Sequence, residues 1–265
     1  MKDPRNPLDL KDSTIQAYLH QLRPDGNLLK VFSPGGLDEI RPARIGDCVD
    51  GHPHPITANR EIALLPRMFK YATRREWCDR NPCIGVERNK ETPRRRYVEG
   101  WEYAAVRELA LPAVGIAVDV SHLTGPRMGD ILKIRIDDYD DKFLVIREDK
   151  TNTKVRFEMS DTLYAALEAS KELLGKAKNF YVVRTRNGRQ HSLGGFKSIW
   201  QRLQGRTIEN GKLKNRFTFH DIRAKHATDR NEESTNAQLA LGHLSPEITR
   251  RYIRSPKGRM VKPLR

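Results

Sequence analysis

The sequence contains one tyrosine that could attack a phosphodiester, together with two arginines and two histidines that could assist it. Tyr252 follows His243 by nine residues near the end of the chain. Upstream, Arg127 ends the run Thr-Gly-Pro-Arg, and the run His-Asp-Ile-Arg contains His220 and Arg223. A tyrosine hydroxyl can act as the nucleophile, but the phosphate is already an anion and gains charge in the transition state. Cationic side chains around the phosphate would stabilise that charge.

Their predicted positions allow these cations to reach one phosphate. Arg127 lies at the start of a predicted helix, where backbone N–H groups favour anions and a guanidinium can bind two oxygens. His220 and Arg223 have an i, i+3 spacing, which puts both on one helix face. Lys150 is predicted in a β-turn, from which a long amine can reach into a cleft.

The predicted reaction is a displacement at phosphorus. Tyr252 attacks the phosphorus atom, while Arg127 and Arg223 hold the non-bridging oxygens. Lys150 protonates the departing 5′-oxygen, which would otherwise be a poor leaving group.

Two histidines complete the predicted reaction. His220 accepts or shares the tyrosine proton, and His243 donates to a non-bridging oxygen. No metal or other cofactor is required, because the arginines supply the positive charge. Cys48, His52 and His54 are poorly spaced for a metal site and read as part of a loop.

Each residue also has an ordinary explanation when it is taken alone. A single tyrosine is more often a core or surface residue, and a lone His-x-x-Arg pair is commonly surface charge. Lys150 by itself carries no signal. The acidic run 137–141 could suggest a metal nuclease, but a solvated turn explains it better without matching carboxylates elsewhere. The specificity therefore comes from the order and spacing of the whole set.

The composition indicates a polyanionic partner. Among 265 residues, 49 Lys and Arg oppose 34 Asp and Glu, which gives a formal net charge of +15. An excess of this size favours nucleic acid over a membrane surface. No apolar run approaches the ~18 residues needed to span a bilayer, and the N-terminus begins no signal peptide. Three cysteines without a CxxC motif indicate a reduced intracellular chain.

Hydrophobic periodicity predicts a mostly helical chain with a small antiparallel β-sheet. Pro66 is expected to kink or split a long helix over 57–77. Two strands, 142–147 and 154–159, flank turn residues at 149–153. Also predicted are a short buried strand over 180–183 and helices over 13–23, 41–49, 101–110, 113–123, 127–134, 160–174, 193–204, 219–231, 235–241 and 246–253.

A basic, polar stretch divides the chain into two predicted domains. Residues 1–90 form a helical DNA-binding domain, 91–97 a linker that touches the duplex backbone, and 98–265 the catalytic domain. A solvated surface is the alternative for the arginines of the 57–77 helix, but phosphate contacts dominate DNA affinity and favour binding. The predicted DNA-binding residues are Arg60, Arg67, Arg74, Arg75, Arg94, Arg95 and Arg96.

Together, these motifs resemble those of the tyrosine recombinase (phage integrase) family. In the family's order they are Thr124-Gly125-Pro126-Arg127-Met128-Gly129-Asp130, then Lys150, then His220-Asp221-Ile222-Arg223, then Leu241-Gly242-His243 and Tyr252. The likeness covers residues 98–265, and residues 12–90 more weakly resemble the family's helical core-binding domain. It implies catalytic roles for Arg127, Lys150, His220, Arg223, His243 and Tyr252, with Asp130 as an acid that helps to orient the site.

The resemblance also implies an assembly on DNA. It predicts strand exchange without ATP, through a 3′-phosphotyrosyl intermediate and a Holliday junction, by a homotetramer on paired sites in double-stranded DNA. Accessory DNA-bending proteins are further expected partners. The expected protein is bacterial or phage-encoded, cytoplasmic and associated with the nucleoid. Many members carry an additional arm-site domain. Because residues before 12 leave no room for one, the chain is either a simple recombinase or the core and catalytic part of a larger protein.

Two positions depart from the family's pattern. Pro126 precedes the first arginine, where an apolar residue such as Leu or Met is usual. Ala224 follows Arg223, where many members have a histidine, and the next histidine is His226. We expect both departures to be tolerated, since proline is acceptable at a helix start.

Three functions stay open from the sequence. The first is a site-specific DNA recombinase that integrates or excises a mobile element. A type IB topoisomerase-like relaxase would use similar chemistry, but the size of the chain and its separate first domain favour recombination. A non-catalytic DNA-binding remnant is the third, and six intact residues argue against it.

Overall fold

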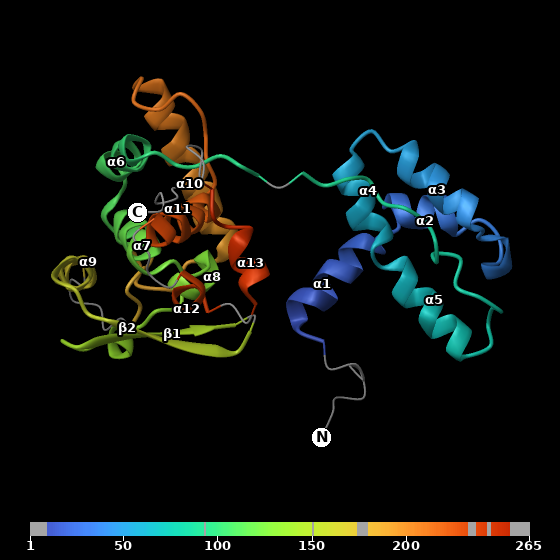
Figure 1. Cartoon of the computed structure of the whole chain (residues 1–265), viewed down its shortest axis with the longest axis horizontal. Coiled ribbons are helices and arrows are strands. Elements are labelled where there is room, and N and C mark those ends of the chain that lie inside the picture. Colours follow the sequence, from blue (N-terminus) through green and yellow to red (C-terminus); the bar gives the residue numbers. More distant parts are fainter. Residues whose placement is uncertain are drawn as a thin grey trace, which may run out of the picture. The chain divides into compact units, whose positions relative to one another are not determined.

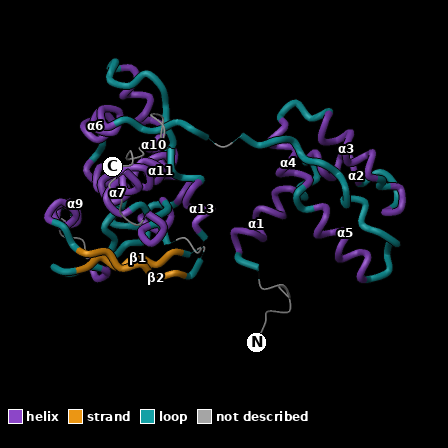
Figure 2. Tube along the Cα trace, in the orientation of Figure 1, coloured by secondary structure: helices purple, strands orange, loops and turns teal. Residues whose placement is uncertain are grey.

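The chain forms two compact units, of which the first ends at Thr92. The computed structural model describes residues 10–92, 94–149, 151–173, 180–232, 237–242 and 245–254. The described residues are mostly helical, with one two-stranded antiparallel sheet (Figures 1 and 2), which confirms the predicted fold class.

The described part of the first unit is built from short helices. Three of them carry proline in the first turn, where its fixed φ suits a helix and its missing N–H has no intrahelical partner. The elements are α1 (Asp12–Gln21), α2 (Asn27–Phe32), the 3-10 helix η1 (Leu37–Glu39), α3 (Pro42–Asp50), α4 (Pro55–Ile62) and α5 (Leu65–Arg74).

A hydrophobic core joins these helices. Leu28 and Phe32 from α2 pack with Ile45 from α3 and with Leu65 and Phe69 from α5, and all are buried. Burial of one such side chain contributes about 1.5–3 kcal/mol relative to exposure. Helix α2 was not predicted, because a segment of six residues is too short to reveal its helical period.

The predicted long helix over 57–77 is two helices in the structure. Helix α4 ends at Ile62 and α5 begins at Leu65, so the chain divides just before Pro66. This is the split expected from a residue that lacks an N–H and collides with the preceding turn. The helical segments begin earlier and end earlier than predicted.

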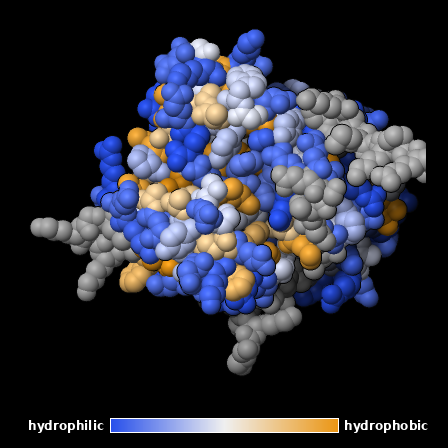
Figure 3. All heavy atoms as spheres, turned by 60° about the vertical axis from the view of Figure 1, so that its left-hand side comes forward, coloured by the Kyte–Doolittle hydropathy of each residue, from blue (hydrophilic) through white to orange (hydrophobic). Residues whose placement is uncertain are grey.

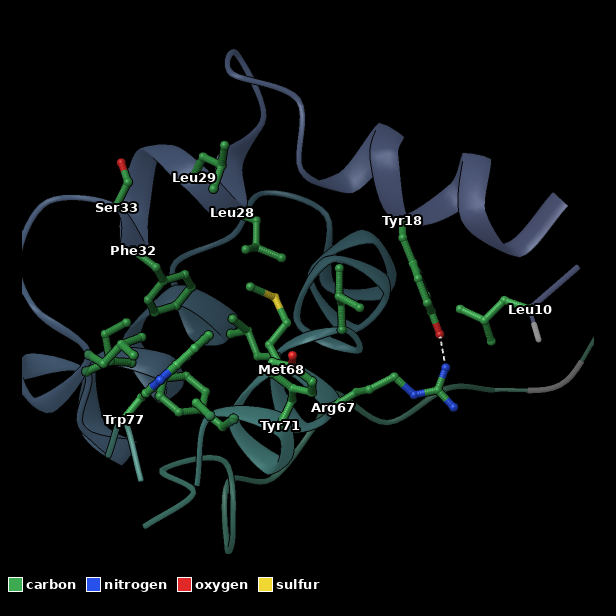
Figure 4. A pocket seen from close by; sticks show the side chains of 16 residues that line it. Leu10, Tyr18, Leu28, Leu29, Phe32, Ser33, Arg67, Met68, Tyr71 and Trp77 are labelled. Atoms are coloured by element: carbon green, nitrogen blue, oxygen red, sulfur yellow. Dashed lines mark hydrogen bonds between the residues drawn. The ribbon is translucent and has the colours of Figure 1, made fainter. Parts of the chain in front are cut away.

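An apolar pocket of about 420 Å³ lies in the first unit (Figure 4). Leu28, Phe32 and Trp77 contribute to its lining. Tyr18 of α1 lies at one side, where its hydroxyl accepts a hydrogen bond from Arg67. The predicted catalytic residues that the structure describes lie in the second unit instead.

The second unit combines helices with the small sheet. Its elements are α6 (Gly100–Leu109), α7 (Pro112–Thr124), α8 (Met128–Ile131), the 3-10 helix η2 (Ile136–Asp138), β1 (Phe143–Glu148), β2 (Thr153–Glu158), α9 (Asp161–Glu172), α10 (Leu193–Glu209), α11 (Phe219–Glu232), α12 (Ala237–Ala240) and α13 (Pro246–Arg250). Helices α9 and α11 both pack against α7. Helix α7 is therefore buried over most of its length, with Val114, Ile116, Val118 and Val120 in the core.

The sheet is a hairpin that points a carboxylate inward. Strands β1 and β2 pair side by side (Figure 2). In their antiparallel register, Phe143 lies opposite Glu158 and Glu148 opposite Thr153. Along β1 the buried positions alternate, because successive side chains point to opposite faces. Leu144, Ile146 and Glu148 share the buried face, and Glu148 thus enters the interior near the predicted catalytic residues.

Several predicted elements of the second unit have different bounds. The expected strand over 180–183 is only an isolated bridge between Tyr181 and Arg135, because no further pairing extends it in the described residues. Helix α8 is shorter than the predicted 127–134, and α10 continues past 204 to Glu209. The last predicted helix, 246–253, ends at Arg250.

The surface is polar over most of the face drawn in Figure 3. Apolar side chains stand there in small groups among hydrophilic ones. Among the helices of the described residues, none combines the length and apolarity that crossing a membrane would require.

Candidate active site

The turn between α7 and α8 presents Arg127 at a helix start. Gly125 follows α7 with a φ of 72°, a left-handed conformation that costs other residues roughly 1–2 kcal/mol. Pro126 fits after it, because a glycine has no Cβ to meet the proline ring. Arg127 then takes the N-cap position of α8. The unusual proline is thus compatible with the position predicted for this arginine.

His226 of α11 packs against that turn. A Cβ on Gly125 would lie 2.4 Å from Cδ2 of the His226 ring. Nδ1 of the ring lies 2.6 Å from the carbonyl oxygen of His122, to which it donates, because a carbonyl can only accept. Burial lowers the pKa of His226 to about 4, so the ring is neutral at pH 7. The histidine holds the turn before Arg127 against α11.

Helix α11 carries His220 and Arg223 one turn apart. The side chain of Arg223 is 1% exposed, and its guanidinium donates to the carbonyl oxygens of Gly125 and Leu241. These carbonyls belong to two other segments of the site, which Arg223 therefore ties to α11. Burial, and then the charge of Arg127, lowers the pKa of Arg223. An anion entering between the two guanidiniums would relieve their repulsion.

Tyr252 lies beside both residues of α11. Its ring centroid is 5.2 Å from that of His220. The central guanidinium carbon of Arg223 is 5.3 Å from the tyrosine ring centroid. Tyr252 stands in the turn after α13 rather than on the helix itself, which corrects the predicted helical position.

Arg254 anchors the segment that carries Tyr252. Its guanidinium donates to Oδ1 of Asp221 at 2.6 Å and to the carbonyl oxygen of Arg96 at 2.7 Å. Its backbone N–H donates to Oγ1 of Thr228 at 2.8 Å. Burial alone would raise the pKa of Asp221, but hydrogen bonds, foremost from Arg254, lower it below its usual value.

Glu148 is a buried acid at the centre of the site. Its side chain is 3% exposed, and Oε1 lies 2.8 Å from Nη1 of Arg127 and 3.5 Å from Nη1 of Arg223. Oε2 accepts a hydrogen bond of 2.9 Å from the hydroxyl of Thr151. Sequence reasoning missed Glu148. The available signal was an acid on the face of β1 that otherwise carries apolar residues.

Asp130, the predicted supporting acid, contacts the hairpin from α8. Its Oδ1 accepts a hydrogen bond of 3.1 Å from the backbone N–H of Asp149. Burial raises the pKa of its carboxyl group. This bond holds the end of β1, next to the turn, against the start of α8.

Lys150 and His243 lie outside the described residues, so their predicted roles stay predictions. Their described neighbours do join the site. Thr151 follows Lys150 and bonds Glu148, while Leu241 is held by Arg223. The elements on either side of these residues also meet, since α12 contacts both α13 and β2 in the second unit (Figure 1).

His220 is suited to accept a proton. Burial, and then the charge of Arg223, lowers its pKa, so the imidazole is neutral at pH 7. A neutral imidazole beside a phenol can act as a general base.

A basic cleft of about 940 Å³ opens beside the site. Arg127 and His220 form part of its wall, so an anion in the cleft could reach both. Three of the lining residues were not predicted, because isolated polar residues on helices and loops carry no motif: Lys197, Gln201 and Arg216. Further lining residues are Arg94, Arg95, Arg96, Met128, Gly129, Trp200, Gln204, Phe217, Thr218, Phe219 and Asp221.

The three predicted linker arginines therefore differ in their contacts. Arg94 and Arg95 line the cleft with exposed side chains. Arg96 instead forms an ion pair with Glu102 and donates to the carbonyl oxygen of Arg216 at 2.7 Å. The guanidinium of Arg96 thus fixes this part of the chain to the second unit as well as lining the cleft. An arginine of a free linker would not make such contacts.

The predicted DNA-binding arginines of the first unit are exposed, but most also contact other side chains. Arg60 pairs with Glu91 at 2.8 Å. Arg67 bonds the Tyr18 hydroxyl, and Arg75 lies over the Tyr71 ring at 4.9 Å. Exposed pairs of this kind contribute little to stability, so these side chains stay available to a stronger anion.

Comparisons with known proteins place these observations in a family. Residues 103–259, more than half of the chain, match the model of the Phage integrase family. The integrase of Escherichia phage HK022 is 26% identical over 224 residues, which cover 74% of this chain and 57% of that protein. The chain thus spans little more than half the length of this relative.

Solved structures share the fold. A lambda integrase (75–356) dimer bound to a COC′ core site has a TM-score of 0.81 at 19% identity, covering 98% of this chain and 95% of that one. A lambda integrase tetramer bound to a Holliday junction has a TM-score of 0.78 at 20% identity, covering 97% and 75%. At these identities, the likeness concerns the fold.

Proposed function

The chain belongs to the phage integrase family, and we therefore propose that it is a site-specific DNA recombinase that cleaves and rejoins DNA through a covalent tyrosyl intermediate. The observation that carries the proposal is the position of Tyr252, whose ring lies beside His220 and Arg223. A phenol, a neutral base and a buried guanidinium suit nucleophilic attack on a phosphodiester.

In the proposed reaction, one bond to phosphorus replaces another. The Tyr252 oxygen bonds to phosphorus as the bond to the 5′-oxygen breaks, which leaves a 3′-phosphotyrosyl link and a free 5′ end. His220 accepts the phenolic proton, and Lys150 gives a proton to the 5′-oxygen. Attack by another 5′-hydroxyl reverses these steps and rejoins the strand without ATP.

Charge stabilisation falls to the cationic groups. Arg127 and Arg223 bind the non-bridging oxygens, and His243 donates a further hydrogen bond. The loss of one such donor typically costs on the order of 10²–10³-fold in rate. Asp130 supports the site indirectly, through its bond to the hairpin next to Lys150.

The proposed DNA path uses the basic cleft. Arg94, Arg95, Lys197 and Arg216 are placed to contact backbone phosphates on either side of the attacked one. In the first unit, a helical core-type DNA-binding domain by this proposal, Arg60, Arg67, Arg74 and Arg75 add phosphate contacts. Because such contacts carry no base identity, they position the duplex rather than select its sequence.

The proposed assembly is a homotetramer on paired sites in double-stranded DNA. It is supported by the shared fold with a lambda integrase tetramer bound to a Holliday junction. Accessory DNA-bending proteins, and a location on the nucleoid of a bacterial cell, belong to the same proposal.

Covalent trapping tests the function. Wild-type protein is incubated with DNA fragments from the mobile element and from its host. The DNA that stays bound under denaturing conditions is then sequenced to find the site. A duplex of that site, nicked near the cleavage position so that the short 5′ fragment is lost, then accumulates the adduct. We expect a slowly migrating band with wild type and with Tyr164→Phe, an exposed control on α9, and no band with Tyr252→Phe. A band of equal intensity with Tyr252→Phe would contradict the proposal.

A further inference from the structure

The Glu148 carboxylate contacts three of the segments that form the proposed site. Its Oε1 lies 2.8 Å from Nη1 of Arg127, before α8, and 3.5 Å from Nη1 of Arg223, on α11. Its Oε2 accepts the hydroxyl of Thr151, the residue that follows Lys150 in the hairpin turn. One buried side chain therefore joins both clamping arginines to the turn that carries the proposed general acid.

A fourth segment passes directly over the same carboxylate. Gly242, which precedes His243, has a φ of 61° and lies so close that a Cβ there would be 3.0 Å from Oε2 of Glu148. Its backbone is thus in contact with the acid. The segment leading to His243 therefore lies close against Glu148.

The charge of Glu148 compensates the charges of the two arginines beside it. Two guanidiniums that converge on one phosphate repel each other when the phosphate is absent, and a buried charge without a partner is costly. A carboxylate between Arg127 and Arg223 offsets that repulsion before DNA arrives. The acid itself needs both cations, because it is 3% exposed and would otherwise be an uncompensated buried anion.

Glu148 holds Arg127 by an ion pair rather than by a hydrogen bond. Although Nη1 of Arg127 lies 2.8 Å from Glu148, the pair has the distance of an ion pair without the angles of a hydrogen bond, and this buried nitrogen has no hydrogen-bond partner among the described residues. Glu148 thus holds Arg127 by charge, while the side chain as a whole stays 23% exposed and contributes to the wall of the cleft.

We propose that Glu148 is the positioning residue of the active site, which sets Arg127 and Arg223 at the spacing of two non-bridging phosphate oxygens and keeps the turn of Lys150 beside them. The proposal rests on the proposed function, since it concerns the same reaction. Glu148 touches neither the reacting atoms nor the DNA in this scheme, and acts through the arginines.

The test compares two glutamates of one hairpin. Glu148→Gln keeps the shape of the side chain and removes its charge, while Glu158→Gln makes the same change at an exposed position of β2. Cleavage of the nicked duplex is measured in a single turnover at saturating protein, with DNA affinity measured separately. A misplacement of about 1 Å can cost roughly 10²-fold, so we expect Glu148→Gln to cleave about that much more slowly and Glu158→Gln to match wild type. DNA affinity should change by less than about threefold, since Glu148 does not touch the DNA and its replacement removes no contact with a phosphate.

A neutral linkage separates positioning from general damage. In a methylphosphonate, a methyl group replaces one non-bridging oxygen and removes its charge, so the attacked group depends less on two well-placed arginines. If Glu148 acts by positioning them, the ratio of wild-type to Glu148→Gln rates should shrink at least tenfold on this substrate. If the ratio of wild-type to Glu148→Gln rates were equal on both substrates, the proposal would be overturned. A general structural defect would slow cleavage of the charged and the neutral linkage to the same extent.

Glu148→Asp covers the case in which the glutamine variant does not fold. It keeps the negative charge but withdraws it by one methylene from Arg127, so slow cleavage is again expected on the natural linkage. If a folded Glu148→Asp or Glu148→Gln cleaved at the wild-type rate, the positioning role would be refuted. Formation of the covalent adduct by these proteins would still support the proposed recombinase. Absence of any adduct with wild type would instead remove the proposed function, and this inference with it.

Discussion

His226 is a buried histidine that ties the turn before Arg127 to α11. Its ring meets Gly125 and donates to the His122 carbonyl, and burial lowers its pKa to about 4. It stands three residues after Arg223, where the sequence offers no reason to separate it from a surface histidine. Its role follows from packing, which only the folded chain reveals.

Stability should depend on pH through His226. The unfolded chain takes up a proton near pH 6.5, whereas the folded chain does so only near pH 4, so stability is full above pH 6.5 and falls as the pH decreases through this window. At about 1.4 kcal/mol for each pH unit, the loss is on the order of 3 kcal/mol. Urea unfolding between pH 4 and pH 8 measures it. His226→Gln should flatten the dependence, and an unchanged slope in that variant would disprove the assignment.

At the scale of elements, the site depends on how short segments meet α11. The α7–α8 turn needs a left-handed residue at Gly125, and the backbone oxygen of that residue accepts a bond from Arg223. Strain in the turn would therefore reach Arg127 and Arg223, the two arginines proposed to bind the phosphate.

Gly125→Ala should damage both fold and cleavage. The left-handed φ alone costs about 1–2 kcal/mol, and the new Cβ would lie 2.4 Å from the His226 ring, which must move. We expect a lower thermal midpoint and slower covalent cleavage. Gly194→Ala on α10 is the matched control, since its Cβ would meet no atom within 4 Å. Equal midpoints for the two variants would show that the turn is not restrained as described.

The segment after α13 is held by a buried ion pair. The side chains of Arg254 and Asp221 are each 7% exposed. Arg254→Met would leave Asp221 as a buried charge without its main partner, at a cost of about 3–5 kcal/mol. It should also release the chain next to Tyr252 and lower the adduct yield. Asp221→Asn combined with Arg254→Met should restore part of the stability, and a double variant no more stable than Arg254→Met would argue against the pair.

Across the whole molecule, the proposed encounter with DNA depends on charge. The chain carries a formal net charge of +15, and the basic cleft beside Arg127 concentrates part of it in the second unit. Binding should release counterions and weaken as salt rises.

Lys197→Gln should lower the salt dependence of DNA binding. Loss of one phosphate contact reduces the slope of log affinity against log salt by about 1, with little change in sequence preference. Lys171→Gln removes the same charge from α9, where the lysine pairs with Glu168 and does not line the cleft, and should leave the slope unchanged. Fluorescence anisotropy over a salt series measures both, and equal slopes for the two variants would exclude Lys197 from the interface.

Local patterns predicted the parts of this molecule that depend on local order. The hairpin and the helix of His220 and Arg223 follow from periodicity and spacing that stay within one element. The expected strand over 180–183 failed because a short apolar run cannot reveal whether a partner strand exists. The link between Arg254 and Asp221 spans 33 positions, so no short pattern contains it. Glu148 needed the fold as well, since its partners come from three separate segments.

Thr228 lies on α11 together with His220 and Arg223, and its hydroxyl oxygen accepts the backbone N–H of Arg254, two residues beyond the tyrosine. The proposed base, the proposed clamping arginine and the anchor of the Tyr252 segment therefore all lie on α11. A movement of α11 would therefore carry these three groups together.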